Sequence, residues 1–391
     1  LVVAQVALAV VLVIGSGLML RSVANLYAVD IGYVTENILT FRINPRPSVY
    51  DTPEERVGLY RELLSRINAL PGVRAAAATS SLPMTGGVNN WSILIEGRPV
   101  ANVGEAPADL VQRVTPEYLE ALGLTLVRGR WFTALDDAES PPVVVVTEAM
   151  ARKHWPGEEA IGKRMKVFSP EWPWMEVVGI AKDVRHQGPG VEARPRWYVP
   201  HAQAYVSAYG SPLAGALAIR SDLDPAPLMR AVEGVIREID ASIPISNVQT
   251  MDQILNGAVG SQRFVMRLLT AFGLLALFLA VVGAYGTVSF AVSKRTREIG
   301  LRMALGARAS RVLGTILGEG LVLAMVGVAV GLGGGFALSR VFRSLVYGIT
   351  TTDPVTYIAV GIALTVAVAL ASLLPARRAS RISPVQALRE D

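Results

Sequence analysis

The stretch LVVAQVALAVVLVIGSGLML (Leu1–Leu20) opens the chain and contains no charged residue. An α-helix rises about 1.5 Å per residue, so this run matches a hydrocarbon core about 30 Å thick. Three more apolar runs lie in the last third of the chain, at Leu268–Val292, Val312–Leu338 and Val355–Leu374, the last stopped by Pro375. This layout predicts a membrane α-helical protein with four transmembrane helices and a large insert between the first and the second.

The composition agrees with a membrane protein and excludes several kinds of chemistry. Hydrophobic residues make up 51% of the chain, charged residues only 18%, and the mean hydropathy is positive. No cysteine occurs, so disulfides, thiolate metal sites and cysteine nucleophiles are excluded. The insert must therefore be stabilised by burial of apolar surface, and it is long enough for that.

The first apolar run has a second interpretation, as a cleaved signal peptide. Its twenty residues exceed the usual apolar core of about 7–15 residues, and no basic segment precedes it. A membrane helix is therefore favoured. Because the chain opens on Leu1 without Met, we expect a fragment whose cytoplasmic start is missing.

The distribution of basic residues predicts which ends of the helices face the cytoplasm. Between the second and third runs, six basic residues stand against one acidic residue, Glu298, and four arginines follow the fourth run. The loop Ser344–Pro354 between the third and fourth runs has no Lys or Arg. By the positive-inside rule the two basic segments are cytoplasmic, and the loop and the insert are outside. Arg21, Arg340 and Arg343 on the outer side count mildly against this orientation.

The insert, residues 21–263, is predicted to fold as a large extracytoplasmic α+β domain. Asn37–Ile43 alternates like a strand and leads into a helix after a capping box at Thr52–Glu55; a second strand and helix recur late, the helix starting at Asp224-Pro225. Two such strand–helix–strand units are expected to pack into one mixed sheet, with chance similarity of two ordinary units as the alternative. Between them, residues 91–205 are predicted to form a more β-rich inserted subdomain. The remainder, residues 264–391, is expected to form the membrane domain that contains the other three helices.

Two apparent sites in the insert are set aside. Gly157–Lys163 matches the glycine and lysine positions of a phosphate-binding loop, but Arg164 stands where Ser or Thr must hold magnesium. The only histidines, His154, His186 and His201, are far apart in the sequence and are expected to be isolated polar surface residues. No catalytic residue, metal ligand or cofactor-binding residue is assigned.

Two further patterns are assigned to packing. Gly327, Gly331 and Gly335 share a four-residue spacing inside the third apolar run, where small residues let helices approach closely. The turn-rich segment Trp172-Pro173-Trp174 is either a partner contact or a loop packed onto its own domain, and packing is favoured.

Glu319 is the one carboxylate in the third apolar run, eight residues after Arg311. That spacing places Glu319 about 12 Å along the helix, where a carboxylate is usually paired or lines a polar cavity. The alternative is a residue near the inner interface that reaches water or an arginine such as Arg311, and this alternative is favoured.

The most specific stretch is SKRTREIGLRMALGA (Ser293–Ala307), between the second and third runs. It is predicted to be an amphipathic cytoplasmic extension of the second helix, in which Glu298 can pair with Arg302 at i,i+4 and Gly306 ends the helix. Any polytopic protein carries a basic inner loop, which would explain the arginines but neither the apolar stripe nor the glycines.

This stretch resembles the cytoplasmic loop of the MacB/FtsX family of ABC-transporter permeases, whose pattern is close to R-x-x-E-I-G-x-x-x-A-x-G-A. The residues that match the pattern are Arg295, Glu298, Ile299, Gly300, Ala304, Gly306 and Ala307. The resemblance continues in Leu70–Val73, Val114–Leu119, Tyr198–Pro200 and Pro375–Ser380. The chain looks most like the C-terminal half of a duplicated, eight-helix orphan permease with a MacB-like periplasmic core domain.

The resemblance implies force transmission by a permease that is not itself an enzyme. A cytoplasmic ABC ATPase would bind the inner loop, and its closure would move the membrane helices and the periplasmic domain, acting on a periplasmic or outer-leaflet substrate. The ATPase-coupling loop would consist of Arg295, Glu298, Ile299, Gly300, Arg302, Ala304, Gly306 and Ala307. The chain itself would bind no cofactor, because ATP would belong to the partner ATPase.

Other implied partners are a second permease half or chain, a periplasmic adaptor and the lipid bilayer, with no nucleic acid. A signalling or scaffold protein of the FtsX type, which controls a cell-wall hydrolase, stays open as an alternative. An integral membrane enzyme is disfavoured, because no cluster of Asp, His or Cys stands at the membrane face. Co-purification separates these classes: an exporter should bring down an ATPase and an adaptor, and a signalling protein a hydrolase.

The predicted orientation is testable because the chain has no native cysteine. A single cysteine at Ser293 should react with a membrane-impermeant thiol reagent only from the cytoplasmic side, and one at Ser211 or Thr351 only from outside. Labelling of intact cells and of inverted vesicles measures this. Reactivity of position 293 from the exterior alone would overturn the cytoplasmic assignment of the coupling loop.

Overall fold

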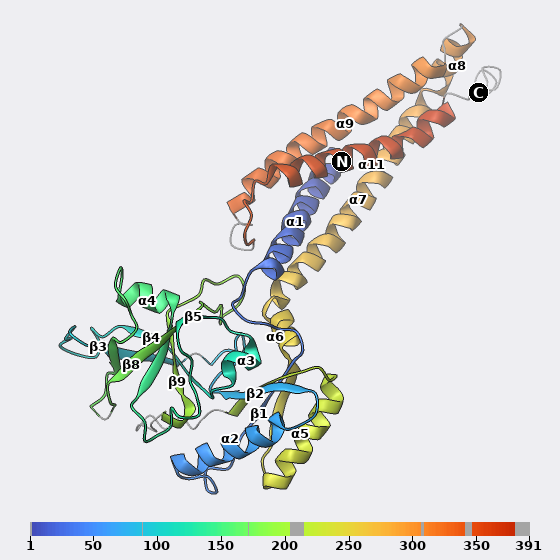
Figure 1. Cartoon of the computed structure of the whole chain (residues 1–391). Coiled ribbons are helices and arrows are strands. Elements are labelled where there is room, and N and C mark those ends of the chain that lie inside the picture. The colour runs from blue at the N-terminus through green and yellow to red at the C-terminus, as the bar shows by residue number, and fades with distance from the viewer. Residues whose placement is uncertain are drawn as a thin grey trace. The chain divides into compact units, whose positions relative to one another are not determined.

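The computed structural model describes residues 2–87, 89–170, 172–203, 215–305, 309–340 and 346–379, so Ser211 lies outside it. The chain divides into two compact units (Figure 1). One comprises Leu1–Ala28 and Gly260–Asp391, and the other comprises Val29–Val259. They are called below the membrane unit and the extracytoplasmic unit.

Four helices in the described part of the membrane unit are long and apolar enough to cross a membrane, as predicted. They are α1 (Val2–Ala28), α7 (Gly260–Lys294), α9 (Ala309–Ala337) and α11 (Pro354–Ala379), with the short α8 (Thr296–Ala304) after α7. One predicted end is wrong, because Pro375 lies inside α11 instead of stopping it. A proline removes only its own N–H from the helix, and membrane helices tolerate that loss.

Helix α1 contacts each of the other three long helices, and glycines of α9 allow a close approach between α9 and α1. Gly327, Gly331 and Gly335 of α9 face Val6, Val10 and Ile14 of α1, which are completely buried. A Cβ added at Gly331 would lie 2.5 Å from the Val10 Cβ and 2.8 Å from the carbonyl oxygen of Ala7. The glycine spacing therefore serves close helix packing, as predicted.

Helix α1 continues eight residues beyond the predicted apolar run because polar groups hold its outer end. The Ser22 hydroxyl accepts a hydrogen bond of 2.7 Å from the backbone N–H of Tyr347. The Asn25 side-chain amide donates one of 3.1 Å to the carbonyl of Gly348. The Tyr347 N–H and the Gly348 carbonyl both belong to the segment that leads into α11, so these two bonds fix that segment to α1.

An ion pair lies beside these contacts. Arg21 pairs with Asp353, whose carboxylate also accepts a 2.9 Å hydrogen bond from the N–H of Thr356 in the first turn of α11. Arg21, which counted against the predicted orientation, is thus neutralised by an N-capping carboxylate on the same side of the membrane.

The extracytoplasmic unit is built on a continuous sheet. Its strand order is β11-β1-β10-β2-β4-β3-β7-β8-β6-β9, with β5 paired to β8. The strands are β1 (Ile38–Ile43), β2 (Val73–Thr79), β3 (Asn89–Ile95), β4 (Ala108–Val114), β5 (Leu126–Gly129), β6 (Val143–Thr147), β7 (Arg164–Val167), β8 (Met175–Ala181), β9 (Arg196–Pro200), β10 (Gly215–Ser221) and β11 (Ile245–Thr250). The helices are α2 (Pro53–Asn68), α3 (Tyr118–Leu122), α4 (Glu148–His154), α5 (Pro225–Asp240) and α6 (Met251–Ala258), with a 3₁₀ turn η1 (His201–Gln203).

The two predicted strand–helix–strand units, β1-α2-β2 and β10-α5-β11, interleave in this sheet. Strand β1 pairs antiparallel with β10 and β11, and β10 pairs antiparallel with β2. The four strands of the two units therefore form an antiparallel part of the sheet, whereas a mixed sheet was predicted for them. The predicted capping box is present at the start of α2, where Thr52 and Glu55 exchange hydrogen bonds of 3.2 and 3.0 Å. Helices α2 and α5 pack on the strands through one apolar core.

The inserted segment continues the same sheet. It joins the first part at a single β2–β4 residue pair, Thr79 with Val114. Parallel pairing occurs here, between β4 and β9 and between β6 and β8. Trp172 is buried and its ring packs edge-on against Trp91 at 5.4 Å between centroids, in agreement with the packing interpretation.

The three histidines are buried, so their assignment to the surface was wrong. The His154 Nε2 lies 2.6 Å from the carboxylate of Asp109, which is buried as well. The His186 ring lies 3.4 Å from the Ser81 hydroxyl. Burial lowers the pKa of His201 to about 3, so its ring is neutral at pH 7. Neutral or paired imidazoles are compatible with a protein interior, which the spacing of three single residues does not reveal.

The glycine contact gives a matched pair of substitutions on one helix. Gly331→Ala should destabilise the bundle by about 1–3 kcal/mol, because the new methyl group collides with α1 backbone and side-chain atoms. Gly333→Ala should be neutral or stabilising, because that position faces open space and alanine favours the helix. Thermal unfolding of both variants in the same detergent measures the difference, and equal midpoints would contradict the packing argument.

Candidate functional site

The predicted inner loop folds as the end of α7, a single turn residue at Arg295, and α8 (Figure 1). Helical hydrogen bonds continue across the turn, since the Arg295 N–H reaches the carbonyl of Ala291 at 3.2 Å and the Ile299 N–H reaches the carbonyl of Arg295 at 2.9 Å. The Thr296 hydroxyl donates to the carbonyl of Val292 at 3.1 Å. Helix α8 is thus an extension of α7 beyond the turn at Arg295, and Arg295 together with α8 is called the elbow below.

An ion pair joins this turn to the next membrane helix. The Arg295 guanidinium lies 2.6 Å from the Glu319 carboxylate of α9, and their side chains are 55% and 49% exposed. The expectation that Glu319 reaches an arginine is met by Arg295 and not by Arg311. Arg311 is on the same helix only two turns away, whereas the fold of the α7–α9 connection brings Arg295 to the carboxylate.

The ion pair borders a small apolar cavity of about 50 Å³ between α7, α8 and α9. Ile299 of α8 is buried there, near Val288 of α7 and Ile316 and Leu323 of α9. The isoleucine of the predicted coupling motif therefore packs α8 onto the two long helices. Any displacement of α8 must move Ile299 relative to α9 or carry α9 with it.

Of the other predicted coupling residues, four lie on α8 and two lie outside the part of the chain that the structure describes. Glu298 is exposed, and Gly300, Arg302 and Ala304 lie on α8. Gly306 and Ala307 lie outside the described residues. Leu301 and Leu305 are 52% and 81% exposed, so the apolar stripe predicted for this segment does not pack against the residues that the structure describes.

A contact at the same end of the bundle was not predicted. Arg378, near the end of α11, donates a hydrogen bond of 3.1 Å to the Tyr285 hydroxyl of α7. A tyrosine close to the inner end of an apolar run, with an arginine at the same depth on another run, is the signal that could have indicated it.

Four apolar helices, an α+β domain between the first and second, and a basic helical elbow at the inner end define a membrane permease. Residues 1–239 match the MacB-like periplasmic core domain family, and residues 270–384 match the FtsX-like permease C-terminal family. The chain belongs to the MacB-like family of ABC-transporter permeases. It is accordingly a multi-pass protein of the inner membrane whose large domain is extracytoplasmic.

Curated relatives carry the name of macrolide export ATP-binding/permease protein MacB. The protein of Chromobacterium violaceum is 28% identical over 275 residues, covering 70% of this chain and 42% of the relative. That of Hahella chejuensis is 26% identical over 284 residues, covering 71% and 42%. The chain thus spans about two fifths of the length of these relatives.

Solved structures of extracytoplasmic regions are also similar to part of this chain. The periplasmic region of MacB from Actinobacillus actinomycetemcomitans matches 60% of this chain and 95% of that structure, with 13% identity and a TM-score of 0.41. The extracellular domain of the ABC-type transporter YknZ from Gram-positive bacteria matches 54% and 100%, with 15% identity and a TM-score of 0.36.

The Arg295–Glu319 pair can be tested for function apart from stability. Glu319→Gln should leave membrane insertion intact and change the free energy of unfolding little, because exposed ion pairs contribute little to stability. Transport activity should fall, and the exchanged pair Arg295→Glu with Glu319→Arg should recover part of it. Activity of the complete transporter in vesicles is the measurement; unchanged activity in Glu319→Gln would discard a functional role for the pair.

Proposed function

We propose that this chain is the permease subunit of an ATP-driven transporter and transmits motion from a cytoplasmic ATPase to its extracytoplasmic domain. The observation that carries the proposal is the continuity of α7. This helix runs for 35 residues without a break, which corresponds to about 52 Å. It begins one residue after Val259, the last residue of the extracytoplasmic unit, and ends at the inner elbow.

Helix α8 supports the docking of a partner on the inner side. It presents the exposed Leu301, followed by Leu305, beside basic residues such as Arg297, while Ile299 fixes it to the bundle. An apolar patch rimmed by charges is typical of a protein interface. The partner would be the ABC ATPase subunit, and ATP would bind to that subunit rather than to this chain.

The core of the membrane unit supports action on a substrate outside the bundle. The apolar cluster that joins its four long helices runs from Val6 and Val10 of α1 to Leu364 and Val368 of α11. A route for a polar substrate needs polar lining, and the buried polar side chains of the described long helices are only the hydroxyls of Ser22, Thr356 and Ser372. The substrate would therefore be a periplasmic or outer-leaflet molecule handled by the extracytoplasmic domain.

The proposal includes parts that this chain does not contain. The ATPase, a second permease half or chain, and a periplasmic adaptor would complete the transporter. The relatives named as ATP-binding/permease proteins, of which this chain spans about two fifths, support the association with an ATPase.

The stiffness of α7 is the property to test. Leu275 and Leu279 are half exposed on α7, so their replacement removes little packing inside the chain. The double variant Leu275→Gly/Leu279→Gly should loosen the helix by about 1 kcal/mol per position and reduce coupling, whereas Leu275→Ala/Leu279→Ala should keep it.

Coupling is measured as the nucleotide-dependent change in mobility of a spin label on Ala101→Cys in the extracytoplasmic unit, with the transporter reconstituted together with its ATPase. ATP hydrolysis is recorded in parallel. Equal label responses in the glycine and alanine variants would show that α7 does not carry the motion.

A further inference from the structure

A cavity of about 470 Å³ lies inside the extracytoplasmic unit, far in sequence from the coupling elbow. One side is lined by Val57, Tyr60 and Leu64 of α2, and the other by residues of the inserted segment around α3 and after β9. Its volume is within the range of about 300–1,000 Å³ that is usual for small-molecule sites. Both parts of the sheet therefore contribute to one cavity, which is open to solvent on the side of the exposed Arg61.

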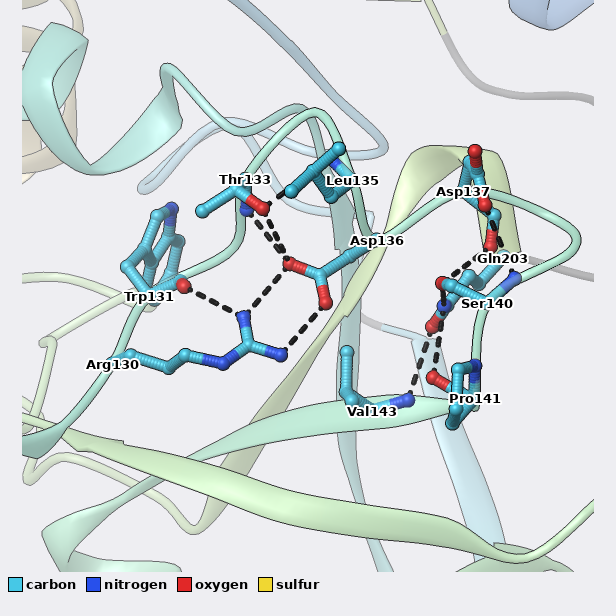
Figure 2. Close-up of polar contacts among 10 residues, drawn as sticks. All are labelled: Arg130, Trp131, Thr133, Leu135, Asp136, Asp137, Ser140, Pro141, Val143 and Gln203. Carbon is cyan, nitrogen blue, oxygen red and sulfur yellow. Dashed lines mark hydrogen bonds and ion pairs between the residues drawn. The ribbon is translucent and has the colours of Figure 1, made fainter.

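Hydrogen bonds fix Asp136 and Thr133 on one side of the cavity, and Figure 2 shows these contacts. The Asp136 carboxylate accepts two hydrogen bonds of 2.8 Å from the Arg130 guanidinium, one to each oxygen, and another of 2.8 Å from the backbone N–H of Thr133. Asp136 and Thr133 both line the cavity. Burial raises the pKa of Asp136, but the bonds from Arg130 outweigh it and the pKa is lowered overall. The Asp136 charge is thus balanced by Arg130 and is not available to a ligand.

Two other charged side chains line the same cavity, and neither is paired with an opposite charge among the described residues in the way that Asp136 is paired with Arg130. Arg61 of α2 and Glu117, the residue before α3, form no ion pair or side-chain hydrogen bond with any residue that the structure describes. Other surface arginines of the unit, such as Arg66 on the same helix, do pair with carboxylates. One cation and one anion that line the same cavity match a ligand that carries one charge of each sign.

The remaining lining is apolar and aromatic. The Tyr60 ring meets the neutral His201 ring edge-on at 4.9 Å between centroids, and both line the cavity. An electron-rich phenol face attracts an ammonium group, and the aliphatic residues of α2 can cover an apolar body.

We propose that this cavity binds a small amphipathic zwitterion, a molecule with an ammonium group and a carboxylate on an apolar body. The ammonium would pair with Glu117 near the Tyr60 ring, the carboxylate would pair with Arg61, and the apolar body would lie on Leu64 and Val57. This site goes beyond the proposed coupling function and does not depend on it, because binding requires neither ATP nor a partner.

The test uses the full chain in detergent and three matched probes: L-phenylalanyl-L-leucine, its N-acetyl derivative and its C-terminal amide. The free dipeptide should bind, and loss of either charge should weaken binding about tenfold, the effect of one charge-assisted hydrogen bond. Isothermal titration calorimetry measures the affinities. Protection of a Ser65→Cys thiol from alkylation, at a residue that lines the cavity, locates the site.

Two variants assign the charges. Glu117→Gln should remove the preference for a free ammonium and keep the preference for a carboxylate, and Arg61→Gln should do the reverse. Glu120→Gln and Arg66→Gln, on the same two segments but outside the cavity lining, should keep both preferences. Equal affinity for all three probes, preferences that survive in Glu117→Gln and Arg61→Gln, or no saturable binding of the dipeptide would each overturn the proposal.

Discussion

The close approach of α1 to its neighbours is the constraint on which the membrane unit depends. Inside a bilayer, lipid tails are as apolar as leucine, so helices associate only where their backbones and side chains fit closely. Gly327, Gly331 and Gly335 of α9 provide that fit for α1, and small residues of α7 such as Gly273 and Ala280 provide it on another side. Since α1 leads at Ala28 into the extracytoplasmic unit, this packing also decides which helices can act on that unit.

Polar contacts between helices concentrate at the two ends of the bundle. At the outer end, Arg21 pairs with Asp353; at the inner end, Arg295 pairs with Glu319 and Arg378 bonds to Tyr285. Charged groups are least costly near the interfaces, where they can also reach water. These contacts and the packing of the bundle link α9 and α11 to α1 and α7, the two helices through which the chain passes into and out of the extracytoplasmic unit.

Local signals allowed much of the fold to be predicted, and contacts between distant residues did not follow from them. The Thr52 capping box and the glycine spacing of α9 are fixed by neighbouring residues, and both are present. An arginine partner for Glu319 was expected, but its identity depends on how α7 and α9 meet, and Arg295, 24 residues away in the sequence, is the partner in place of the example Arg311. Interleaving of the two strand–helix–strand units and burial of the histidines likewise arise from tertiary pairing, which propensity and periodicity do not encode.

The cavity lined by Arg61 and Glu117 spans the junction between the two parts of the extracytoplasmic sheet, so a ligand bound there would act on the domain that the permease is proposed to move. Strands β2 and β4 join the two parts of the sheet at the residue pair Thr79 with Val114, and hydrogen bonds such as Ser80 N–H to the Arg113 carbonyl at 2.9 Å flank this pair. Arg61 belongs to the first part and Glu117 to the inserted segment, on either side of that junction. A ligand that contacts both Arg61 and Glu117 binds more tightly to the conformation of the domain in which both contacts can form. It therefore shifts the equilibrium toward that conformation, by an amount set by the difference in affinity. Occupancy of the cavity would therefore bias the shape of the domain that α1 and α7 are proposed to move.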